Sequence, residues 1–259
     1  MADAHPKIAI IRVADRADAV IEALRERGAD PLLVPSMVVA DPEDDGPLRE
    51  AAADLSRYDA VILGSIAGAE ALVARAGDQV FEGLVFCVGA QTRKRLDADP
   101  KLARILAGPR VVPADARAEG LEEAIRMNLS PLANKRFLFP RPPEGRLALV
   151  ERLEGSRATV DAPDAYRIAA GPPLDASMRR ALEEASAFLF FSGEAVRCFL
   201  ETVPADWGRQ RLTESWVGVI GSAGAEKART LGVRVDGVPE SPGTEALLDL
   251  WTAHWKTKN

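Results

Sequence analysis

The chain contains one pattern twice: an apolar run, a serine, and then helical spacing of apolar residues. The first run, from Tyr58 to Leu63, leads to Ser65, and the second, from Phe188 to Phe191, leads to Ser192. A short apolar run followed by a small polar turn and an amphipathic segment is typical of a buried parallel strand that feeds a helix. The pattern therefore predicts two strand–turn–helix units of the same design.

The repeat extends well beyond these two segments, which is the signature of a duplicated architecture. Strand patterns also alternate with helix patterns along the chain, which predicts parallel sheets with helices on both faces. We therefore expect an α/β protein built of two similar doubly wound parallel-sheet domains. The further matching segments are Val85–Thr92 with Val217–Gly224, Pro113–Leu121 with Pro239–Leu247, and Ile8–Val39 with Phe137–Ile168.

Composition limits the class of protein. The 259 residues suffice for two domains of the usual size. No apolar run approaches the roughly 20 residues that a membrane span needs, and the segment Met1–Lys7 does not resemble a signal peptide. The two cysteines, Cys87 and Cys198, are expected to be buried thiols in a reducing, cytoplasmic setting. The net charge of −6 argues against nucleic acid as a partner.

Several kinds of catalytic site are excluded by the residues present. The only histidines, His5 and His254, lie near the two ends of the chain, which excludes a Ser–His–acid triad. No Cys/His cluster has zinc spacing, so no metal site is expected. Gly64–Gly68 only superficially resembles the G-x-S-x-G pattern of a nucleophile turn, since its serine stands one position too early. Because no histidine is available either, we interpret it as a tight strand-to-helix turn. Gly218–Gly221 lacks the full dinucleotide fingerprint.

The remaining candidates are residues at the expected carboxyl ends of strands, where ligands bind in sheets of this type. Backbone N–H groups at helix N-termini can hold anions, and Arg12 and Arg141 can clamp a carboxylate. The alternative for the arginines is solvated charge at a strand end, and for the hydroxyl residues it is helix capping alone. The strand-end set is Arg12, Ser65, Gly89, Arg141, Ser192 and Gly221, and the capping hydroxyls are Ser65, Thr92, Ser192 and Ser222.

Tyr166 is a further candidate, because a phenol can transfer a proton. It lies near the expected crossover between the two halves, and a phenol can donate or accept a hydrogen bond. The alternative is a tyrosine that packs in a strand with its hydroxyl in water.

In their order along the chain, these segments resemble the uroporphyrinogen-III synthase family, over nearly the whole length. The likeness rests on the series rather than on any single motif. Its members are the first strand ending in Arg12, the strand-to-serine segment Tyr58–Ser65, the Gly-x-x-Thr turn Gly89–Thr92, the block from Phe139 through Leu149 to Tyr166, the turns at Phe190–Ser192 and Val219–Gly221, and the closing element Pro239–Leu247.

The resemblance implies two α/β domains joined by a two-stranded connector, with the chain leaving the first domain and returning to it. The first domain would comprise residues 1–36 and 173–259, and the second residues 37–172. Segments 35–39 and 164–168 would form the connector. Such a joint permits hinge motion about few residues.

The resemblance also implies an enzyme without a cofactor, a lyase of porphyrin and heme biosynthesis. It would close the acidic linear tetrapyrrole hydroxymethylbilane to uroporphyrinogen III, with inversion of ring D and loss of water. We expect a cytoplasmic monomer, with the preceding pathway enzyme as a protein partner and no nucleic acid or membrane partner. Tyr166 would assist departure of the hydroxyl. The implied substrate-binding residues are Arg12, Ser65, Gly89, Thr92, Arg141, Arg146, Ser192, Gly193, Gly221 and Ser222.

The chain departs from the family pattern at two places. Gly224 stands where the second Gly-x-x-Thr turn has threonine, and Ile11–Arg12 stands for a Thr-Arg pair. These departures leave an alternative: a catalytically weakened paralogue that acts as a two-domain anion-binding or regulatory protein. A third hypothesis is a two-lobed module that binds a sugar or an amino acid.

Overall fold

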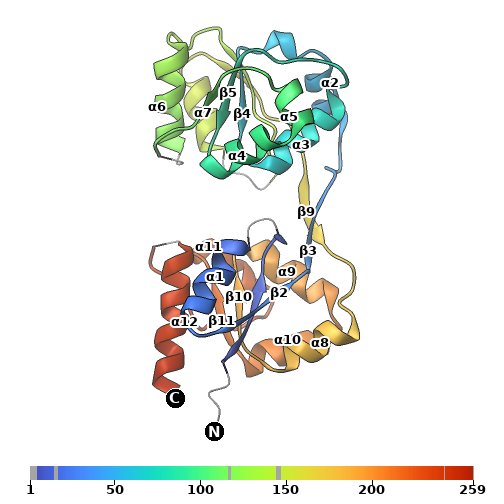
Figure 1. The fold of residues 1–259 in the computed structure, drawn as a ribbon, viewed down its shortest axis with the longest axis vertical. Helices are drawn as coiled ribbons and strands as arrows, with labels where there is room; N and C mark the ends of the chain where they lie inside the picture. The colour runs from blue at the N-terminus through green and yellow to red at the C-terminus, as the bar shows by residue number, and fades with distance from the viewer. Residues whose placement is uncertain (1–4, 15–16, 116–117, 144–146, 242, 259) are drawn as a thin grey trace. The chain divides into compact units, whose positions relative to one another are not determined.

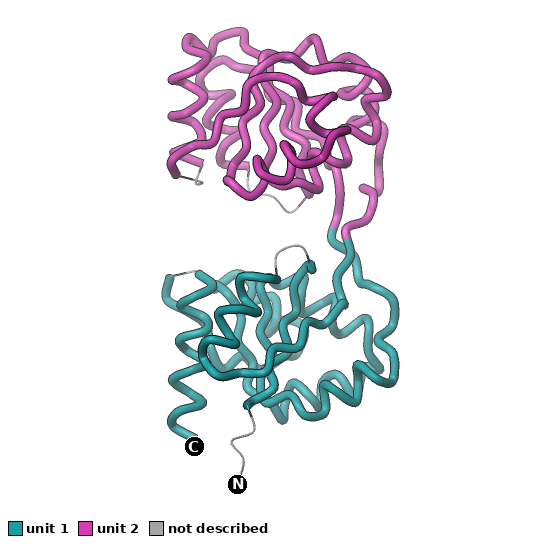
Figure 2. Tube along the Cα trace, in the orientation of Figure 1, with its two compact units in different colours: residues 1–38, 168–259 teal, residues 39–167 magenta. Residues whose placement is uncertain are grey.

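The chain forms two compact units in a computed structural model that describes residues 5–14, 17–115, 118–143, 147–241 and 243–258. Unit 1 comprises Met1–Val38 and Ile168–Asn259, and unit 2 comprises Val39–Arg167 (Figure 2). Unit 1 is thus assembled from two separate stretches of chain, while unit 2 is a single insertion between them.

Unit 1 contains a four-stranded parallel sheet in the order β11-β10-β1-β2. Its central strand β10 ends in four consecutive buried residues, Phe188 among them, as expected of a strand that is covered on both faces. The strands are β1 (Lys7–Ile11), β2 (Asp30–Val34), β10 (Ala185–Phe190) and β11 (Trp216–Val219).

Helices cover both faces of this sheet (Figure 1). On one face, α1 (Asp18–Glu26) and α12 (Thr244–Lys258) pack their apolar residues against Ile8 and Ile10. On the other face, Phe199 of α9 lies edge-to-face with the rings of Phe188 and Phe190, with centroids 5.4 and 6.0 Å apart. The helices on this second face are α8 (Ala176–Glu183), α9 (Gly193–Thr202), α10 (Ala205–Glu214) and α11 (Ser222–Thr230).

Unit 2 contains a five-stranded parallel sheet in the order β6-β5-β4-β7-β8. Helices α6 and α7 pack on one face, where their leucines join Phe86 and Phe137 in a single core. The strands are β4 (Ala60–Leu63), β5 (Leu84–Cys87), β6 (Arg110–Val111), β7 (Arg136–Leu138) and β8 (Thr159–Asp161). The helices are α2 (Gly46–Ala53), α3 (Ile66–Arg75), α4 (Ala90–Ala98), α5 (Pro100–Ile105), α6 (Ala118–Leu129) and α7 (Ala148–Glu154), with a 3₁₀ turn at Leu55–Arg57.

The two sheets have the same strand order and the same register, so the predicted duplication is confirmed. In each sheet, the strand before the serine turn, β10 or β4, lies between two equivalent neighbours. These are the strand before the glycine turn, β11 or β5, and the first strand of the repeat, β1 or β7. Even the last strand corresponds, because Gly218 bridges Gly237 where β5 pairs with β6. The residue pairs of unit 1 and their equivalents in unit 2 are Ile8–Pro31 with Phe137–Val160, Ile8–Ala187 with Phe137–Ala60, and Phe188–Val217 with Val61–Val85.

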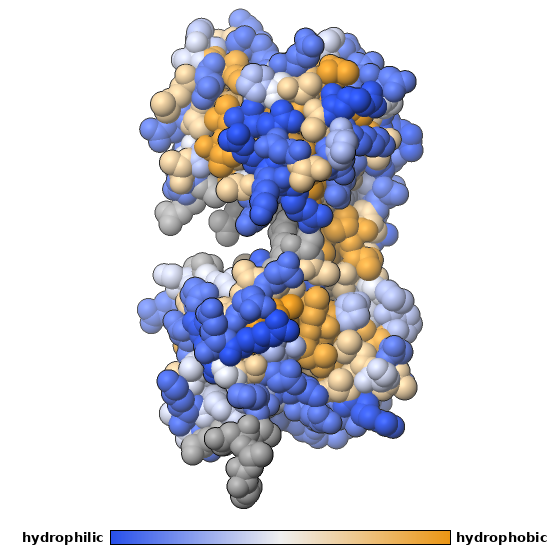
Figure 3. Space-filling view, viewed as in Figure 1, coloured by the Kyte–Doolittle hydropathy of each residue, from blue (hydrophilic) through white to orange (hydrophobic). Residues whose placement is uncertain are grey.

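The chain passes between the units in β3 (Met37–Ala40) and returns in β9 (Arg167–Ala170), which pair as a two-stranded sheet. The two-stranded connector that the resemblance implies is therefore present. Val38 and Val39 are exposed on it, and apolar residues are visible along this segment (Figure 3). None of the described helices is both long and apolar enough to cross a membrane.

Two glycines bring the first turns of α9 and α11 into contact in unit 1. A Cβ atom placed on Gly224 would lie 3.3 Å from the backbone nitrogen of Gly193 and 3.1 Å from a methyl carbon of Val219. A Cβ on Gly193 would in turn lie 2.7 Å from that of Lys227. Glycine at position 224, where the family pattern has threonine, is therefore accounted for by the close packing of these two helices.

We expect Gly224→Thr to destabilise unit 1 by about 1–3 kcal/mol, because a branched side chain overpacks this contact. Ala223→Thr is the control: Ala223 is exposed one residue earlier in α11, and the change should cost only about 0.5 kcal/mol of helix propensity. Urea unfolding followed by tryptophan fluorescence reports unit 1, because all four tryptophans lie in it. Equal midpoints for the two variants would contradict the packing argument.

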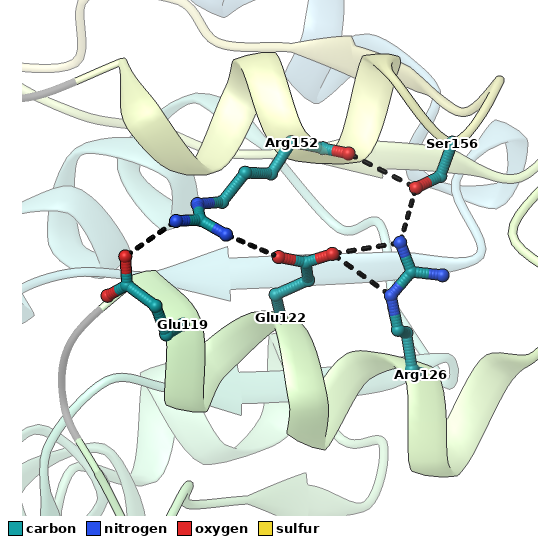
Figure 4. Close-up of polar contacts among 5 residues, drawn as sticks. All are labelled: Glu119, Glu122, Arg126, Arg152 and Ser156. Atoms are coloured by element: carbon teal, nitrogen blue, oxygen red, sulfur yellow. Dashed lines mark hydrogen bonds and ion pairs between the residues drawn. The ribbon is translucent and has the colours of Figure 1, made fainter.

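A network of ion pairs joins α6 to α7 on the surface of unit 2 (Figure 4). Glu122 accepts hydrogen bonds from Arg126, at 2.8 and 3.0 Å, and from Arg152 of α7, at 3.2 Å. Arg152 also pairs with Glu119, and Arg126 donates to Ser156. The bonds from Arg126, supported by Arg152, hold the pKa of Glu122 below its ordinary value against the opposing effect of partial burial.

Glu122→Gln should lower the stability of unit 2 by about 1 kcal/mol at pH 7, because the network loses its central charge. A carboxyl group whose pKa is depressed by folding stabilises the native state above its unfolded pKa of about 4.3 and loses this effect as the pH falls through the folded value. The difference from the parent chain should therefore shrink below about pH 4. Urea unfolding followed by circular dichroism measures this difference, and Glu123→Gln, which changes an exposed neighbour, should show no such pH dependence.

Candidate functional site

Two helices begin directly at the carboxyl ends of the central strands of unit 2. Ser65 follows β4 and caps α3, with its hydroxyl oxygen accepting from the N–H of Gly68 at 3.2 Å. Gly89 follows β5 and occupies the same position before α4, where it provides no side-chain cap. The first N–H groups of α4, up to Thr92, are therefore left for other acceptors, including anions.

Tyr166 lies against the first of these turns. Its phenol oxygen is 2.9 Å from the hydroxyl oxygen of Ser65, which donates to it. Both residues are buried, at 7% and 6% exposure. Ser65 accepts from Gly68 and donates to Tyr166, and no other described residue accepts the phenolic proton, so this proton can meet a further acceptor. This arrangement can place a proton donor at the carboxyl end of the sheet.

Tyr58, the other tyrosine of the chain, has no such proton to offer. Its hydroxyl donates to Asp161 at 2.7 Å and accepts from Arg57 at 2.7 Å. Burial, followed by the bond to Asp161, raises the pKa of Tyr58 to about 12. The guanidinium groups of Arg57 and Arg136 also lie over its ring. Tyr58 therefore serves to hold the sheet together, which leaves Tyr166 as the tyrosine for acid chemistry.

The loop after β7 completes the unit 2 site. A Cβ on Gly68 would lie 2.7 Å from the carbonyl oxygen of Pro140, so the first turn of α3 rests directly on this loop. Arg141 is 7% exposed and donates to the carbonyl of Pro143 at 3.1 Å, with Asp164 4.0 Å away. The guanidinium group thus ties the loop to the segment before Tyr166. Arg146, an expected substrate-binding residue, lies outside the described residues.

Unit 1 presents the equivalent turns at the carboxyl end of its own sheet. Ser192 caps α9 by accepting from the N–H of Ala195 at 3.1 Å, next to Gly193. Gly221 precedes α11, which begins at the exposed Ser222, and has a φ of +81°, a backbone angle that favours glycine. Each unit therefore carries one serine-capped helix and one glycine-capped helix at its strand ends.

Arg12 follows β1 at the same edge of the unit 1 sheet. Its guanidinium carbon lies 4.6 Å from the ring centre of Phe191, the residue after β10. Arg12 is half-buried, whereas its counterpart Arg141 is buried within unit 2. Of the two predicted arginine clamps, Arg12 is therefore the one whose side chain is better placed to meet an anion from solvent.

The two units differ at the position of the phenol. The repeat that matches Ile8–Val39 with Phe137–Ile168 puts Met37 of unit 1 where unit 2 has Tyr166. Met37 packs against the unit 1 core. The duplication therefore supplies two sets of helix N-termini but a single phenol. The repeat made this asymmetry readable from the sequence. The hydrogen bond from Ser65 to Tyr166 and the close packing of α3 on Pro140 instead join distant segments and carry no local signal.

The two cysteines are unsuited to nucleophilic chemistry. Both are buried, and burial raises the pKa of each thiol to about 11. The thiolate, which is the reactive form, is therefore scarce at neutral pH. Within the described ranges, no three residues among His, Cys, Asp and Glu come together in a group that could hold a metal ion.

Comparisons with known proteins agree with this architecture. The structure is similar to uroporphyrinogen-III synthetase from Helicobacter pylori, with 16% identity, a TM-score of 0.56 and coverage of 96% of this chain and 99% of the other. It is also similar to a mutant uroporphyrinogen III synthase from the extremely thermophilic bacterium Thermus thermophilus, with 18% identity, a TM-score of 0.50 and coverage of 97% and 99%. At these identities the likeness establishes the fold.

The family is established by sequence instead. No curated protein matches the chain closely enough to be reported as a relative. A family model does match, however, and it spans residues 18–249, which include the serine turns, both glycine turns and Tyr166. The chain belongs to the uroporphyrinogen-III synthase HemD family.

Proposed function

We propose that this chain is an active uroporphyrinogen-III synthase. It would close hydroxymethylbilane to uroporphyrinogen III, inverting ring D and releasing one water per turnover. The observation that carries the proposal is the buried phenol of Tyr166, which Ser65 holds at a helix N-terminus and whose own proton is accepted by no described residue. Family membership supplies the tetrapyrrole substrate class.

Tyr166 would act at the first step, in which the terminal hydroxyl leaves. The phenolic O–H donates its proton to the departing oxygen, water forms, and the ring system is left as a cationic azafulvene. The C–C bond that forms next gives a spiro intermediate, whose rearrangement inverts ring D before closure. A positioned general acid accelerates such a step by about 10²–10⁴-fold.

The substrate's carboxylates would be held by backbone rather than by a basic surface. The glycine-capped helices α4 and α11 offer N–H groups that no side chain caps, and their macrodipoles favour negative charge. Arg12 adds one guanidinium group in unit 1. This mode of recognition is compatible with the chain's net charge of −6, because the positive ends of the helix dipoles act only locally. Holding the flexible substrate with its ends in the correct order contributes through proximity.

The purified chain should produce the type III isomer from hydroxymethylbilane. Spontaneous closure gives type I, so the ratio of the two isomers separates catalysis from background. The measurement is chromatographic separation of the isomers after coupled generation of the substrate. Accumulation of type I alone, at the rate seen without protein, would falsify the proposed activity.

Tyr166→Phe should lower turnover by about 10²-fold or more, since the proton donor is lost while the ring is kept. Tyr58→Phe is the matched control, because it removes the only other phenolic hydroxyl from a residue that holds the sheet. We expect its activity per folded molecule to stay near the parent value. Unchanged turnover in Tyr166→Phe would remove the tyrosine from the mechanism.

A second candidate is a catalytically weakened member of the family that binds anionic tetrapyrroles without closing them. The observation that favours it is Gly224, which leaves the second turn without the family hydroxyl. The same isomer assay decides between the two, because this candidate binds hydroxymethylbilane yet yields only type I.

A further inference from the structure

Unit 1 has a cavity of about 420 Å³ at the edge of the sheet opposite to the serine and glycine turns. It lies where β10 and β11 begin, beside the C-terminal turns of α12, which runs back along the sheet (Figure 1). Its volume falls within the range of sites that bind small molecules. Ser192 and Gly221 follow the other ends of the same strands, so this cavity is separate from the candidate site described above.

The cavity is lined by an unusual share of the chain's aromatic residues. Three of the four tryptophans, Trp216, Trp251 and Trp255, and one of the two histidines, His254, line it. Trp216 and His254 stack with ring centres 5.7 Å apart, and Trp251 and Trp255 stack at 6.4 Å. Trp216 and Trp251 are buried, whereas His254 and Trp255 are only half-buried. These last two rings therefore form the accessible part of an aromatic wall.

The glycines beneath Trp216 show that this wall is closely fitted. A Cβ on Gly218 would lie 2.5 Å from the indole of Trp216, and a Cβ on Gly237 would lie 2.3 Å from it. The indole consequently packs closely against Gly218 of β11 and against Gly237, with His254 stacked on it. A ring held in this way is preorganised, so a ligand that stacks on the wall does not have to order it.

Two carboxylates and two cationic side chains line the cavity, and both carboxylates are paired with arginines. The carboxylate of Glu214 is paired with Arg211, and that of Asp236 is paired with Arg234 at 3.0 Å. Asp236 also accepts from the N–H of Val217. Lys258, in the last turn of α12, lines the cavity, and its ammonium group makes no ion pair with any described residue. The ammonium group of Lys258 is therefore the lining cation that a negative group of a ligand can meet.

We propose that this cavity binds a planar aromatic molecule that carries one anionic group. The flat ring stacks on Trp255 and His254, and the anion meets the ammonium group of Lys258. Aromatic pairs in this offset geometry add to simple burial of area, which explains the preference for a flat ring. The site is independent of the tetrapyrrole chemistry, because it uses neither the helix N-termini nor Tyr166.

The test is isothermal titration calorimetry of the full chain with 2-naphthoate and with its neutral analogue 2-naphthamide. We expect both to bind, with naphthoate about 2- to 5-fold tighter at low salt, as for a single exposed ion pair. Lys258→Gln should abolish this preference. Lys256→Gln removes the same charge from the same helix outside the cavity and should retain it. Equal effects of the two lysine variants, or no binding of either probe, would overturn the proposal.

A second measurement locates the ring. In a ¹⁵N-labelled sample, naphthoate should shift the indole N–H signals of Trp255 and Trp216 and leave that of Trp207 unchanged, since Trp207 packs in the core on the other face of the sheet. Trp255→Leu should weaken both probes by about 2- to 10-fold, with folding verified by circular dichroism. Shifts of similar size at Trp207, or unchanged binding in Trp255→Leu, would contradict stacking at this wall.

Discussion

Unit 1 depends on the parallel pairing of β1 with β10, two strands that lie on opposite sides of the whole of unit 2 in the sequence. Closing so long a loop costs conformational entropy, although the cost grows only slowly with length. The paired connector strands β3 and β9 reduce this entropic cost, because they bring the two ends of the insertion together. The position of Arg12 beside the residue that follows β10 depends on this one pairing.

The same sheet design then gives each unit two helix N-termini at its strand ends. Serine at one turn accepts from one of the first N–H groups of its helix, whereas glycine at the other provides no side-chain cap. The two units differ in one residue that matters for acid catalysis. Tyr166 meets the serine cap in unit 2, while Met37 packs into the core at the corresponding place in unit 1. One half can therefore supply a proton donor, and both can supply anion-binding backbone.

The two edges of the unit 1 sheet have different chemical characters. At the carboxyl ends of the strands, close glycine contacts bring α9 and α11 together and leave polar turns. At the opposite edge, two glycines instead make room for the indole of Trp216, which lines a cavity together with other aromatic rings. In both places the absence of a side chain determines what can approach the backbone. The presence of glycine at position 224 is thus explained by the close packing of α9 and α11, and the missing hydroxyl group is a consequence of it.

The sequence alone determined the duplicated α/β design, because strand runs, serine turns and glycine turns are local patterns that repeat with their spacing intact. It also identified the strand-end residues, since parallel strands place their carboxyl ends at one edge. The contact between Ser65 and Tyr166, the burial of Arg141 and the charge network of Glu122 were decided only by tertiary structure. These features join residues far apart in the chain, and which side chains meet there depends on packing geometry that no local pattern encodes.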